Sequence, residues 1–541
     1  MFSSLAFPHC YVDIYPFEGG LYSIQGDAGG LLNCSVESNI RNGYGTFSLA
    51  LAPGGPYGPN VSPQWTEVIT PMSLVVIGMQ RAGRSRIVLI GVVRTISETE
   101  VWNPASGVQR SISVTGFDFG YFFTLPNYYT LSLLNATIGA PLGSDGSLAS
   151  IDQGLVYGTP DTVGAAWYKD IMAGPNSIMA KTTFSYQGSR PSFYDMVATY
   201  FQPYSDVDIV IPLGDNFMSA DGTWMDKFRQ LFPFPWYEFF VVTAPPGAYP
   251  GGSANVPISL TAPGFDPACV QLVARVNPLP WTKNLGSGSD LNLKMQFDKW
   301  DLLPQYQLDG NAGPIAKRVM NSEGELRNFY MVNTKWISNL FGLNNDNQTP
   351  FTWLFASWIN TASMHRYGYR PEVAELHWFS DPDGVAAKQY AASGKGQNDF
   401  EAAIANLTLK KTSWHEPSVI MTQADISTNL RPDILPGNRF VCPIHKDNML
   451  WEFYIEGVAH TYQFGGPAVT TLSLNRGLPI DVYNDEDLML AMHIGNVQKV
   501  NGQYKVGLPQ GIGQPLQPLN FSNMTAVIGQ VAGVFAVPQA R

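Results

Sequence analysis

The chain has 541 residues, which at about 150 residues per domain is enough for three or four domains. Lys and Arg number 32 against 43 Asp and Glu, and the net charge of -11 disfavours a protein whose surface as a whole grips nucleic acid. Only 14% of the residues are charged, whereas 52 are Gly and 40 are Pro, and this composition argues against coiled coils and helical repeats. The 45% hydrophobic and 13% aromatic content argues against disorder.

The first 120 residues carry the clearest strand pattern. Apolar side chains alternate with small or polar ones over residues 32–36 and 47–51, and the intervening Asn-Gly-Tyr-Gly segment at 42–45 has the chemistry of a tight turn. This pattern predicts a β-hairpin. Further strands are predicted, separated by Gly-rich or polar turns, at 74–79, 87–93, 96–102 and 110–114. Many short strands joined by such turns indicate a sandwich or a barrel.

The pattern changes after about residue 125. Helices are predicted at 167–173, 193–201 and 223–231, where apolar residues recur about one turn apart and a proline follows. A further helical stretch is predicted at 337–340 and 351–364. The sequence therefore predicts a mixed α/β region inserted after the first β unit.

Alternation returns near the carboxyl end of the chain. Strands are predicted at 439–442, 450–458, 460–464 and 469–474, which places a second β unit near residues 405–478. The segment after residue 508 is rich in Gly, Gln and Pro and has few charges, so we expect an extended arm there.

The histidines provide no recognisable metal or catalytic motif. None stands in an H-E-x-x-H or H-x-H arrangement, and His415 is followed by Glu416 and Pro417, a sequence that a helix cannot continue through. We therefore expect hydrogen-bonded or exposed imidazoles. The seven histidines are His9, His365, His377, His415, His445, His460 and His493.

Other catalytic signatures are equally weak. The sequence contains no G-x-S-x-G nucleophile motif and no G-x-x-x-x-G-K-[ST] phosphate loop, and the glycines around Lys395 fit a turn. Asp381 and Asp383 could form the carboxylate pair of a glycosidase, but a turn is the simpler interpretation of Ser-Asp-Pro-Asp. We predict no catalytic, cofactor-binding or metal-binding residue.

Three further sets of residues are interpreted as structural. Arg81, Arg84 and Arg86 could bind phosphate but fit an exposed hairpin tip better. The large aromatic residues are interpreted as core anchors in preference to sugar platforms. They include Trp224, Trp236, Trp300, Trp378, Trp414 and Trp451. Cys10, Cys34, Cys269 and Cys442 stand singly and are expected to be small apolar packing residues.

Export and membrane signals are not evident in the sequence. Residues 1–17 lack a basic region followed by an apolar one, so no secretory leader is expected. The most apolar stretches, 68–79 and 524–537, are shorter than the roughly 20 residues that span a bilayer, and no membrane span is expected.

The amino-terminal β unit resembles the tube-like barrel of baseplate hub proteins from tailed bacteriophages. The resemblance lies in an oblique strand at 45–51, a hairpin beginning at 69–77, a G-x-V strand at 90–93 and a strand at 114–120 with the pattern V-x-G-x-D.

The carboxyl-terminal β unit is similar to the second barrel of the same hub proteins. The matching segments are 367–371, 435–440, 453–462 and 470–477. The most specific match is the strand FYIEGVAH at 453–460 followed by TTLSLNRG at 470–477.

This resemblance implies a mainly β chain with α+β insertions and two tail-tube-like β-barrel domains. The domains expected are a first barrel at 1–124, a mixed α/β region at 125–364 with strands available to the first barrel, a second barrel at 365–480 and an extended arm at 481–541. It further implies a hub in which a homotrimer forms a ring of approximate six-fold symmetry. Because the sequence offers no candidate catalytic site, we expect a structural, non-enzymatic hub, and the long middle region favours a contractile tail.

The resemblance also implies the partners and the location. The hub would join the tail tube protein to the central spike protein in the virion baseplate, after synthesis in the host cytoplasm. Tape measure and baseplate wedge proteins are further candidate partners. DNA would pass through the ring without specific binding, and we expect part of the excess acidic charge to line that channel and repel phosphate. No cofactor is implied.

Two alternatives belong to other functional classes. A glycan-binding or glycan-cleaving β protein of a virion would show an open cleft with two carboxylates about 5 to 9 Å apart. A secreted β-sandwich adhesin would normally carry an export signal, which is not evident here.

Overall fold

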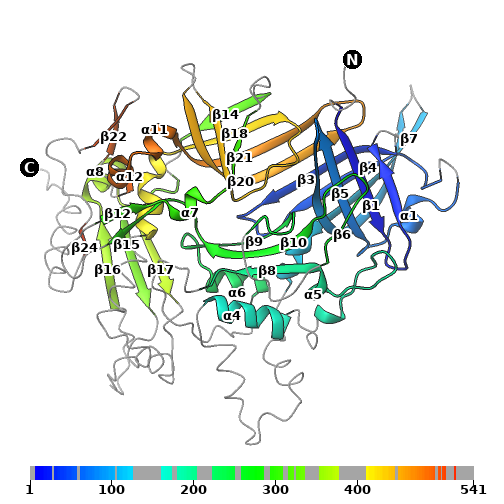
Figure 1. The fold of residues 1–541 in the computed structure, drawn as a ribbon, viewed down its shortest axis with the longest axis horizontal. Helices are drawn as coiled ribbons and strands as arrows, with labels where there is room; N and C mark the ends of the chain where they lie inside the picture. Colours follow the sequence, from blue (N-terminus) through cyan, green and yellow to red (C-terminus); the bar gives the residue numbers. More distant parts are fainter. Residues whose placement is uncertain are drawn as a thin grey trace, which may run out of the picture.

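The computed structural model describes most of the chain. The described residues are 7–26, 30–57, 61–103, 107–125, 160–172, 179–203, 222–249, 258–284, 293–308, 315–321, 324–334, 353–376, 410–444, 449–493, 497–500, 503–506 and 517–518. Strands predominate, and most belong to one large, largely antiparallel sheet (Figure 1). The prediction of a mainly β chain with mixed α/β parts is confirmed.

The first strand unit, unit 1, has the strand order β3-β4-β7-β6-β5-β1-β2. Its strands are β1 (His9–Tyr15), β2 (Tyr22–Gln25), β3 (Leu31–Asn39), β4 (Thr46–Leu51), β5 (Leu74–Arg81), β6 (Arg84–Asn103) and β7 (Gly107–Asp118). The predicted hairpin is confirmed, because β3 and β4 pair with Cys34 opposite Leu49. Both side chains are buried, as the alternation requires for a sheet with one face in the core.

The second strand unit, unit 2, has the order β14-β18-β21-β20-β19-β13. Its strands are β13 (Gln305–Gln307), β14 (Ala316–Met320), β18 (Thr422–Asn429), β19 (Arg439–Pro443), β20 (Leu450–Gln463) and β21 (Ala468–Pro479). The predicted strands at 439–442 and 469–474 are confirmed, and the two strands predicted at 450–458 and 460–464 form one continuous strand, β20. An apolar core that includes Ile426, Phe453 and Leu472 lies within this unit.

The two units repeat one topology. Reading from β3 and from β14, five successive strands correspond: β3 to β14, β4 to β18, β7 to β21, β6 to β20 and β5 to β19, and every pairing among them is antiparallel. The long strands β6 and β20 even share a register shift, between Val93 and Thr95 in one and between Ile455 and Gly457 in the other. The sixth strand differs, because β1 is antiparallel to β5 whereas β13 is parallel to β19.

A smaller sheet lies beneath the large one. It has the order β8-β10-β9, formed by β8 (Val197–Phe201), β9 (Tyr237–Ala244) and β10 (Cys269–Val276). Strands β9 and β10 are buried along their whole length, which explains their nearly continuous apolar sequences. In Figure 1, α4 (Pro160–Ala166) and α6 (Trp224–Leu231) lie below this sheet, and one apolar cluster contains residues of both sheets and both helices.

The remaining elements lie mainly at the end of the molecule away from unit 1, at the left of Figure 1. Two short hairpins and a four-stranded sheet, β17-β15-β16-β24, lie there with several helices. The strands are β11 (Trp281–Asn284), β12 (Leu293–Gln296), β15 (Phe329–Thr334), β16 (Trp353–Ile359), β17 (Pro371–Leu376), β22 (Val497–Val500), β23 (Gln503–Val506) and β24 (Gln517–Pro518). The helices are α7 (Asp298–Asp301), α8 (Thr361–Tyr367), η9 (Glu416–Val419), α11 (Ile480–Tyr483) and α12 (Glu486–His493).

Further short helices occur in the chain between strands. α1 (Trp65–Val68) lies between β4 and β5, and the others lie between β7 and β8: η3 (Phe119–Thr124), η4 (Trp167–Met172), η5 (Met179–Lys181) and α5 (Phe193–Met196). The predicted helices at 167–173 and 223–231 are confirmed as η4, which has π-helical geometry, and α6. Thr223 begins α6 with a capping box to Asp226, and Pro233 follows its end, as the sequence indicates.

Two helix predictions were wrong. The helix predicted at 193–201 ends at Met196, and residues 197–201 form β8, because their alternate side chains pack against the core in a parallel pairing with β10. The helix predicted at 351–364 is largely strand β16, and a helix begins only at Thr361. The segment 337–340 lies outside the described residues.

The strand pairing divides the chain differently from the predicted domains. Unit 2 takes β13 and β14 from the middle region, while residues 371–376 belong to the four-stranded sheet. The start of the arm predicted at 481–541 is helical and packed instead, because residues 481–483 end α11, residues 486–493 form α12, and Met489 and Met492 are buried in an apolar cluster with Trp300 and Tyr454. Residues 519–541 lie outside the described part of the chain.

Candidate functional site

The most informative site is the junction between unit 1 and unit 2. Strand β20 pairs on one side with β19 through residues 450–454 and then with β3 through residues 457–463, so a single strand connects the two units. The register places His460 opposite Val36 and Tyr462 opposite Cys34. The apolar core of unit 1 also contains Tyr462 and Ala468 from unit 2. The junction is therefore a continuous sheet with a shared core.

An arginine holds one end of this junction. Arg41 follows β3 and donates from Nε to Oε1 of Glu456, at 2.8 Å, and from Nη1 to Oε1 of Glu325, also at 2.8 Å. Glu456 is the residue at the register shift in β20. Burial alone would raise the pKa of Glu325, but Arg476 and Arg41 outweigh it and lower that pKa. Arg41 thus connects unit 1 to unit 2 and to the segment before β15.

A buried ion pair connects the small sheet to unit 2. Arg275 of β10 donates from Nε to Oε2 of Glu238 of β9 at 2.9 Å, and the two side chains are only 9% and 5% exposed. Nη2 of Arg275 also donates to the carbonyl of Gly437 at 2.7 Å. The hydroxyl of Tyr454 in β20 donates to the other oxygen of Glu238. Burial lowers the pKa of Arg275, but Glu238 and Tyr454 outweigh that effect and raise it.

Arg86 makes a third connection and corrects a prediction. It was expected at an exposed hairpin tip with Arg81 and Arg84, but its side chain is buried. Its Nη1 donates to the carbonyls of Pro432 and Ile434, each at 3.3 Å, and its Nη2 donates to the carbonyl of Thr243 in β9. Arg86 therefore binds unit 1, the small sheet and unit 2 together, which requires contacts with residues distant in sequence.

His460 lies within the junction in a neutral form. Its Nδ1 is 2.9 Å from Oγ1 of Thr470 on β21, and its ring is buried. Burial, and then the charge of nearby Arg86, lower its pKa to about 3, with Asp433 acting in the opposite direction. The unfolded chain takes up a proton on this residue near pH 6.5, whereas the folded chain does not. His460 therefore reduces the stability of the fold as the pH falls below about 6.5.

We expect His460→Gln to reduce the acid sensitivity of the fold. Between pH 7 and pH 5 the native protein should lose more stability than the variant, by about 2 kcal/mol, because one unfavourable protonation is removed. Urea unfolding at both pH values, at fixed ionic strength and protein concentration, measures the difference. The other titrating groups are present in both proteins and cancel. Equal losses in both proteins would contradict the assignment.

Four histidines are exposed or hydrogen-bonded, as the sequence predicts. His365 is exposed, while His415, His460 and His493 are buried and hydrogen-bonded. Burial lowers the pKa of His415 to about 4 and that of His493 to about 3. His377 and His445 lie outside the described residues.

Two carboxyl groups are also buried. Asp118 accepts hydrogen bonds from the backbone N–H groups of Gly45, at 2.6 Å, and Gly120, at 2.8 Å, and so connects β7 to the start of β4. Glu416 lies at the start of η9. Burial raises the pKa of each to about 8. Asp118 is the aspartate of the V-x-G-x-D pattern, and its contacts are structural.

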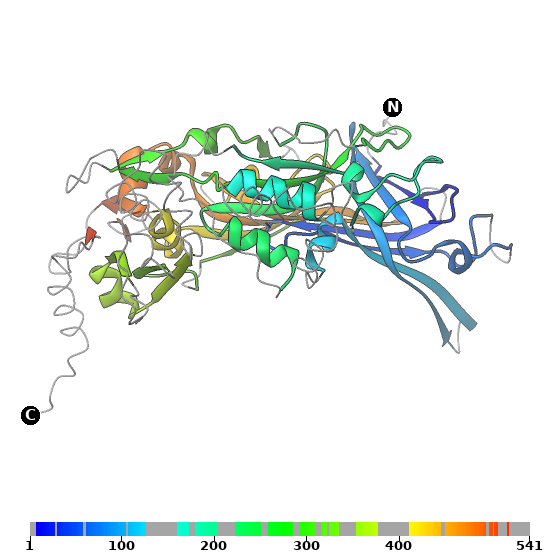
Figure 2. The same ribbon diagram turned by 90° about the horizontal axis from the view of Figure 1, so that it is seen from below.

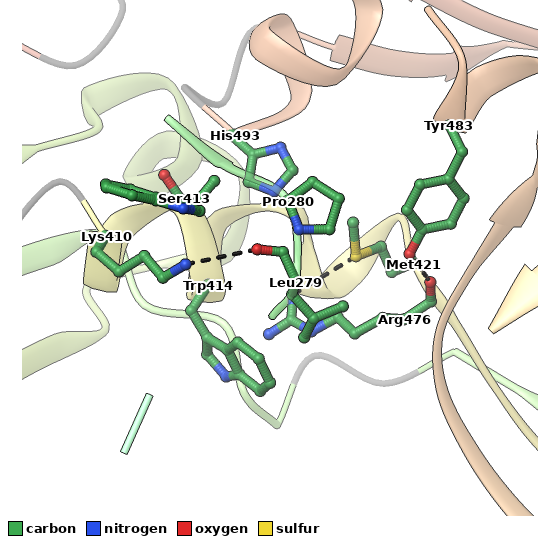
Figure 3. Close-up of a pocket in the computed structure, with 10 residues that line it drawn as sticks. Leu279, Pro280, Lys410, Ser413, Trp414, Met421, Arg476, Tyr483 and His493 are labelled. Atoms are coloured by element: carbon green, nitrogen blue, oxygen red, sulfur yellow. Dashed lines mark hydrogen bonds between the residues drawn. The ribbon is translucent and has the colours of Figure 1, made fainter. Parts of the chain in front are cut away.

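A closely packed cluster lies near the junction (Figure 3). The guanidinium of Arg476 lies 3.8 Å from the centre of the Trp414 ring. The hydroxyl of Tyr483 donates to the carbonyl of Arg476 at 2.6 Å, and Lys410 approaches the carbonyl of Leu279 at 3.5 Å. The remaining cavity is about 10 Å³, which is room for roughly one water molecule. This cluster is a packed support for the junction and has no space for an organic ligand.

A larger cavity of about 270 Å³ lies beside it. Its walls include Phe234, Trp414 and Tyr454 together with the carboxylates of Glu238 and Glu456. Glu238 is bound by Arg275 and Glu456 by Arg41. Both carboxylates beside this cavity are thus bound by arginines that belong to the junction.

The tryptophans and cysteines that the sequence predicts to be packing residues are buried or partly buried wherever the structure describes them. Trp236, Trp300, Trp414 and Trp451 are buried, as predicted for core anchors, and Trp224 is partly buried against the largest apolar cluster. All four cysteines are buried. Trp378, Asp381, Asp383 and the turn at Lys395 lie outside the described residues.

The described residues contain neither a candidate metal site nor a candidate membrane-spanning helix. No group of three or more His, Cys, Asp or Glu side chains within the described ranges is arranged to hold a metal ion. Among the helices of those ranges, none combines the length and the apolar character needed to cross a membrane.

Comparisons with known proteins identify likenesses at the level of structure. No family model matches the sequence, and no curated protein matches it. A tail protein from Neisseria meningitidis has a TM-score of 0.39 and 10% identity, covering 86% of this chain and 96% of its own. A 43 kDa tail protein of prophage MuSo2 from Shewanella oneidensis has a TM-score of 0.38 and 11% identity, covering 86% and 98%.

A third likeness is to prophage tail protein gp18 from Listeria monocytogenes, with a TM-score of 0.35 and 9% identity, covering 86% of this chain and 94% of that one. All three are tail proteins. With TM-scores below 0.5, these likenesses do not by themselves assign the chain to a family.

The sequence did not reveal the residues that form the junction. Arg275 and Glu238 lie in apolar runs whose pattern indicates strands but not partners, and Arg86 adjoins two arginines that are less buried. A charged residue inside an otherwise apolar strand is the one available signal, because such a charge requires a buried partner.

Proposed function

We propose that the chain is a structural baseplate hub of a phage tail. Three copies form a ring in which the two strand units of each copy alternate, so that three-fold symmetry imitates six-fold symmetry. The ring joins the tail tube to the central spike and surrounds the channel through which DNA leaves the particle.

This proposal rests mainly on the repetition of one strand topology in units 1 and 2. Five strands of each unit follow the same order, and the units are joined edge to edge by β20 and β3. A closed ring of similar modules needs paired strand edges at every joint, because an unpaired strand edge can associate with other chains. One chain already contains one joint of this kind.

The junction chemistry is consistent with a permanent, rigid scaffold. Arg41, Arg86 and Arg275 each bind groups from different parts of the chain, and the cluster around Arg476 is closely packed. We therefore infer a structural, non-enzymatic role. The proposed partners are other copies of the chain, the tail tube protein and the central spike protein, with tape measure and wedge proteins as further candidates.

The proposed location is the baseplate of a contractile tail, after synthesis in the host cytoplasm. DNA passes without specific binding, and the net charge of -11 favours a channel that repels phosphate. The glycan-cleaving alternative is less well supported, because Glu238 and Glu456 beside the 270 Å³ cavity are both bound by arginines.

The mass of the assembled protein tests the proposal. Native mass spectrometry of the purified full chain should give a trimer of about 178 kDa, three times the chain mass of 59.3 kDa. A monomer at micromolar concentration, with or without tube and spike proteins, would contradict it.

A further inference from the structure

Among the strand edges that have no partner in the part of the chain that the structure describes, two belong to strands equivalent to those of the junction. Strand β6 pairs with β5 only through residues 84–92, and beyond Val93 no strand lies along that edge. Strand β14 pairs with β18 on one side and is the last strand of the sheet. Open edges present rows of backbone N–H and C=O groups that can accept another strand.

The repeated topology shows what each open edge corresponds to. In unit 2, the half of β20 that follows the register shift pairs with β3. The equivalent half of β6, after the shift at Val93 and Thr95, has no such partner among the residues that the structure describes. The strand equivalent to β3 is β14, since β3 pairs with β4 as β14 pairs with β18. One open edge therefore matches the β20 side of the junction and the other matches the β3 side.

The two open edges of one chain do not meet. Six strands separate β14 from β6 in the sheet, and the far end of the β6–β7 hairpin projects from the molecule in shades of blue at the right of Figure 2. Pairing these two edges with each other would therefore require two copies of the chain.

We propose that β14 of one copy pairs antiparallel with residues 97–101 of β6 in the next copy, reproducing the β20–β3 junction between chains. The inference rests on the proposed ring and specifies its joint. In this joint β6 takes the place of β20 and β14 takes the place of β3, and the register of the β20–β3 pairing is kept. Ser97 then lies opposite Met320, Thr99 opposite Arg318 and Glu100 opposite Lys317.

The side chains on one face of this joint are complementary. Glu100 meets Lys317, so the joint places opposite charges directly across from each other. Within its own chain Glu100 forms an exposed ion pair with Arg110, and Lys317 donates to the carbonyls of Pro443 and Ile444.

Apolar side chains flank the charged pair on the same face. The register places Trp102, which is 70% exposed, opposite Ile315, which is 57% exposed. On the other side of the charged pair, Glu98 lies opposite Val319, which is also exposed. An exposed Trp opposite an exposed Ile indicates a surface that is covered in the assembly.

A disulfide cross-link tests the register. Residues 461 and 35 of the existing junction form a non-hydrogen-bonded pair, because the flanking bonds Phe464 N to Leu32 O and Ile40 N to Glu456 O fix the alternation. The equivalent pair between copies is Thr99 and Arg318. The double variant Thr99→Cys/Arg318→Cys should give covalent trimers under mild oxidation, resolved on a non-reducing gel and reversed by a reductant.

The control is Glu98→Cys/Arg318→Cys, which shifts the register by one residue and places the sulfurs on opposite faces, so it should cross-link at least tenfold less. Each single variant reports any contribution from the four native cysteines. A native trimer whose Thr99→Cys/Arg318→Cys variant forms no covalent trimer would overturn the proposed joint while the proposed ring stands. A native protein that is monomeric would instead contradict the ring.

Charge reversal is a second test that needs no cross-link. Glu100→Lys should weaken trimer association, measured by the dilution at which the trimer dissociates, and adding Lys317→Glu should restore at least part of the loss. Equal dissociation in the native protein, the single variant and the double variant would count against the pairing of these two residues.

Discussion

Arg275→Met should destabilise the fold by about 3 to 5 kcal/mol, measured by urea unfolding at fixed protein concentration. The substitution leaves the buried carboxylate of Glu238 without its 2.9 Å partner and removes the donor to the carbonyl of Gly437. Removing one member of a buried ion pair is costly because the remaining charge has left water without compensation. Because Glu238 also binds Tyr454 of β20, unit 2 should lose its attachment to the small sheet.

A matched control and a double variant separate this effect from general damage. Arg366→Met removes an exposed arginine that lies over Tyr367 and should cost less than about 1 kcal/mol. Arg275→Met/Glu238→Leu should recover part of the loss, since the orphaned charge is gone. Similar unfolding midpoints for Arg275→Met and Arg366→Met would contradict the structural role of the pair.

Arg86→Met should destabilise the fold by about 2 to 4 kcal/mol. The variant keeps an apolar chain of similar length but leaves the carbonyls of Thr243, Pro432 and Ile434 without their donor. An unsatisfied buried carbonyl costs about 1 to 3 kcal/mol, and the release of a buried guanidinium offsets part of the sum. Thermal unfolding at neutral pH measures the change.

Arg81→Met is the control on the same hairpin. Arg81 is partly exposed, and we expect its loss to lower stability by less than about 1 kcal/mol. An effect for Arg81 as large as that for Arg86 would contradict the connecting role assigned to Arg86.

The sequence was sufficient to predict strands whose two faces differ. Residues 34–36 and 47–51 alternate because one face of β3 and β4 is buried, and β20 and β21 were found for the same reason. Leu32 departs from the pattern and is exposed, because the pairing of β3 with β4 is irregular between Leu31 and Asn33. Strand β14 could not be found this way, because four of its five side chains are exposed and its sequence has no alternation. Its place in unit 2 depends on pairing with β18, more than 100 residues later.

Short segments with two possible periods were the source of the wrong helices. Residues 193–201 have apolar side chains that fit both a helix and a strand, and the parallel pairing of β8 with β10 determines the outcome. The junction residues were hidden for a related reason. Arg86 and Arg275 bind groups 157 to 348 residues and 37 to 179 residues away, so their burial follows from the tertiary structure.

The resemblance to baseplate hub proteins predicted two β units but not the form of their connection. The repeated order of five strands and the shared shift in β6 and β20 emerge only from the pairing pattern. The β20–β3 junction, in turn, is what makes the open edges of β6 and β14 interpretable as the two sides of a joint.

The alternation of the two units around a closed ring is the central claim, and electron cryomicroscopy of the purified assembly viewed end on tests it most directly. Without imposed symmetry, the reconstruction should show three chains with units 1 and 2 alternating in six near-equivalent positions and one sheet continuing across every joint. A ring in which unit 1 packs against unit 1 of its neighbour, or particles that contain no closed ring, would contradict the account.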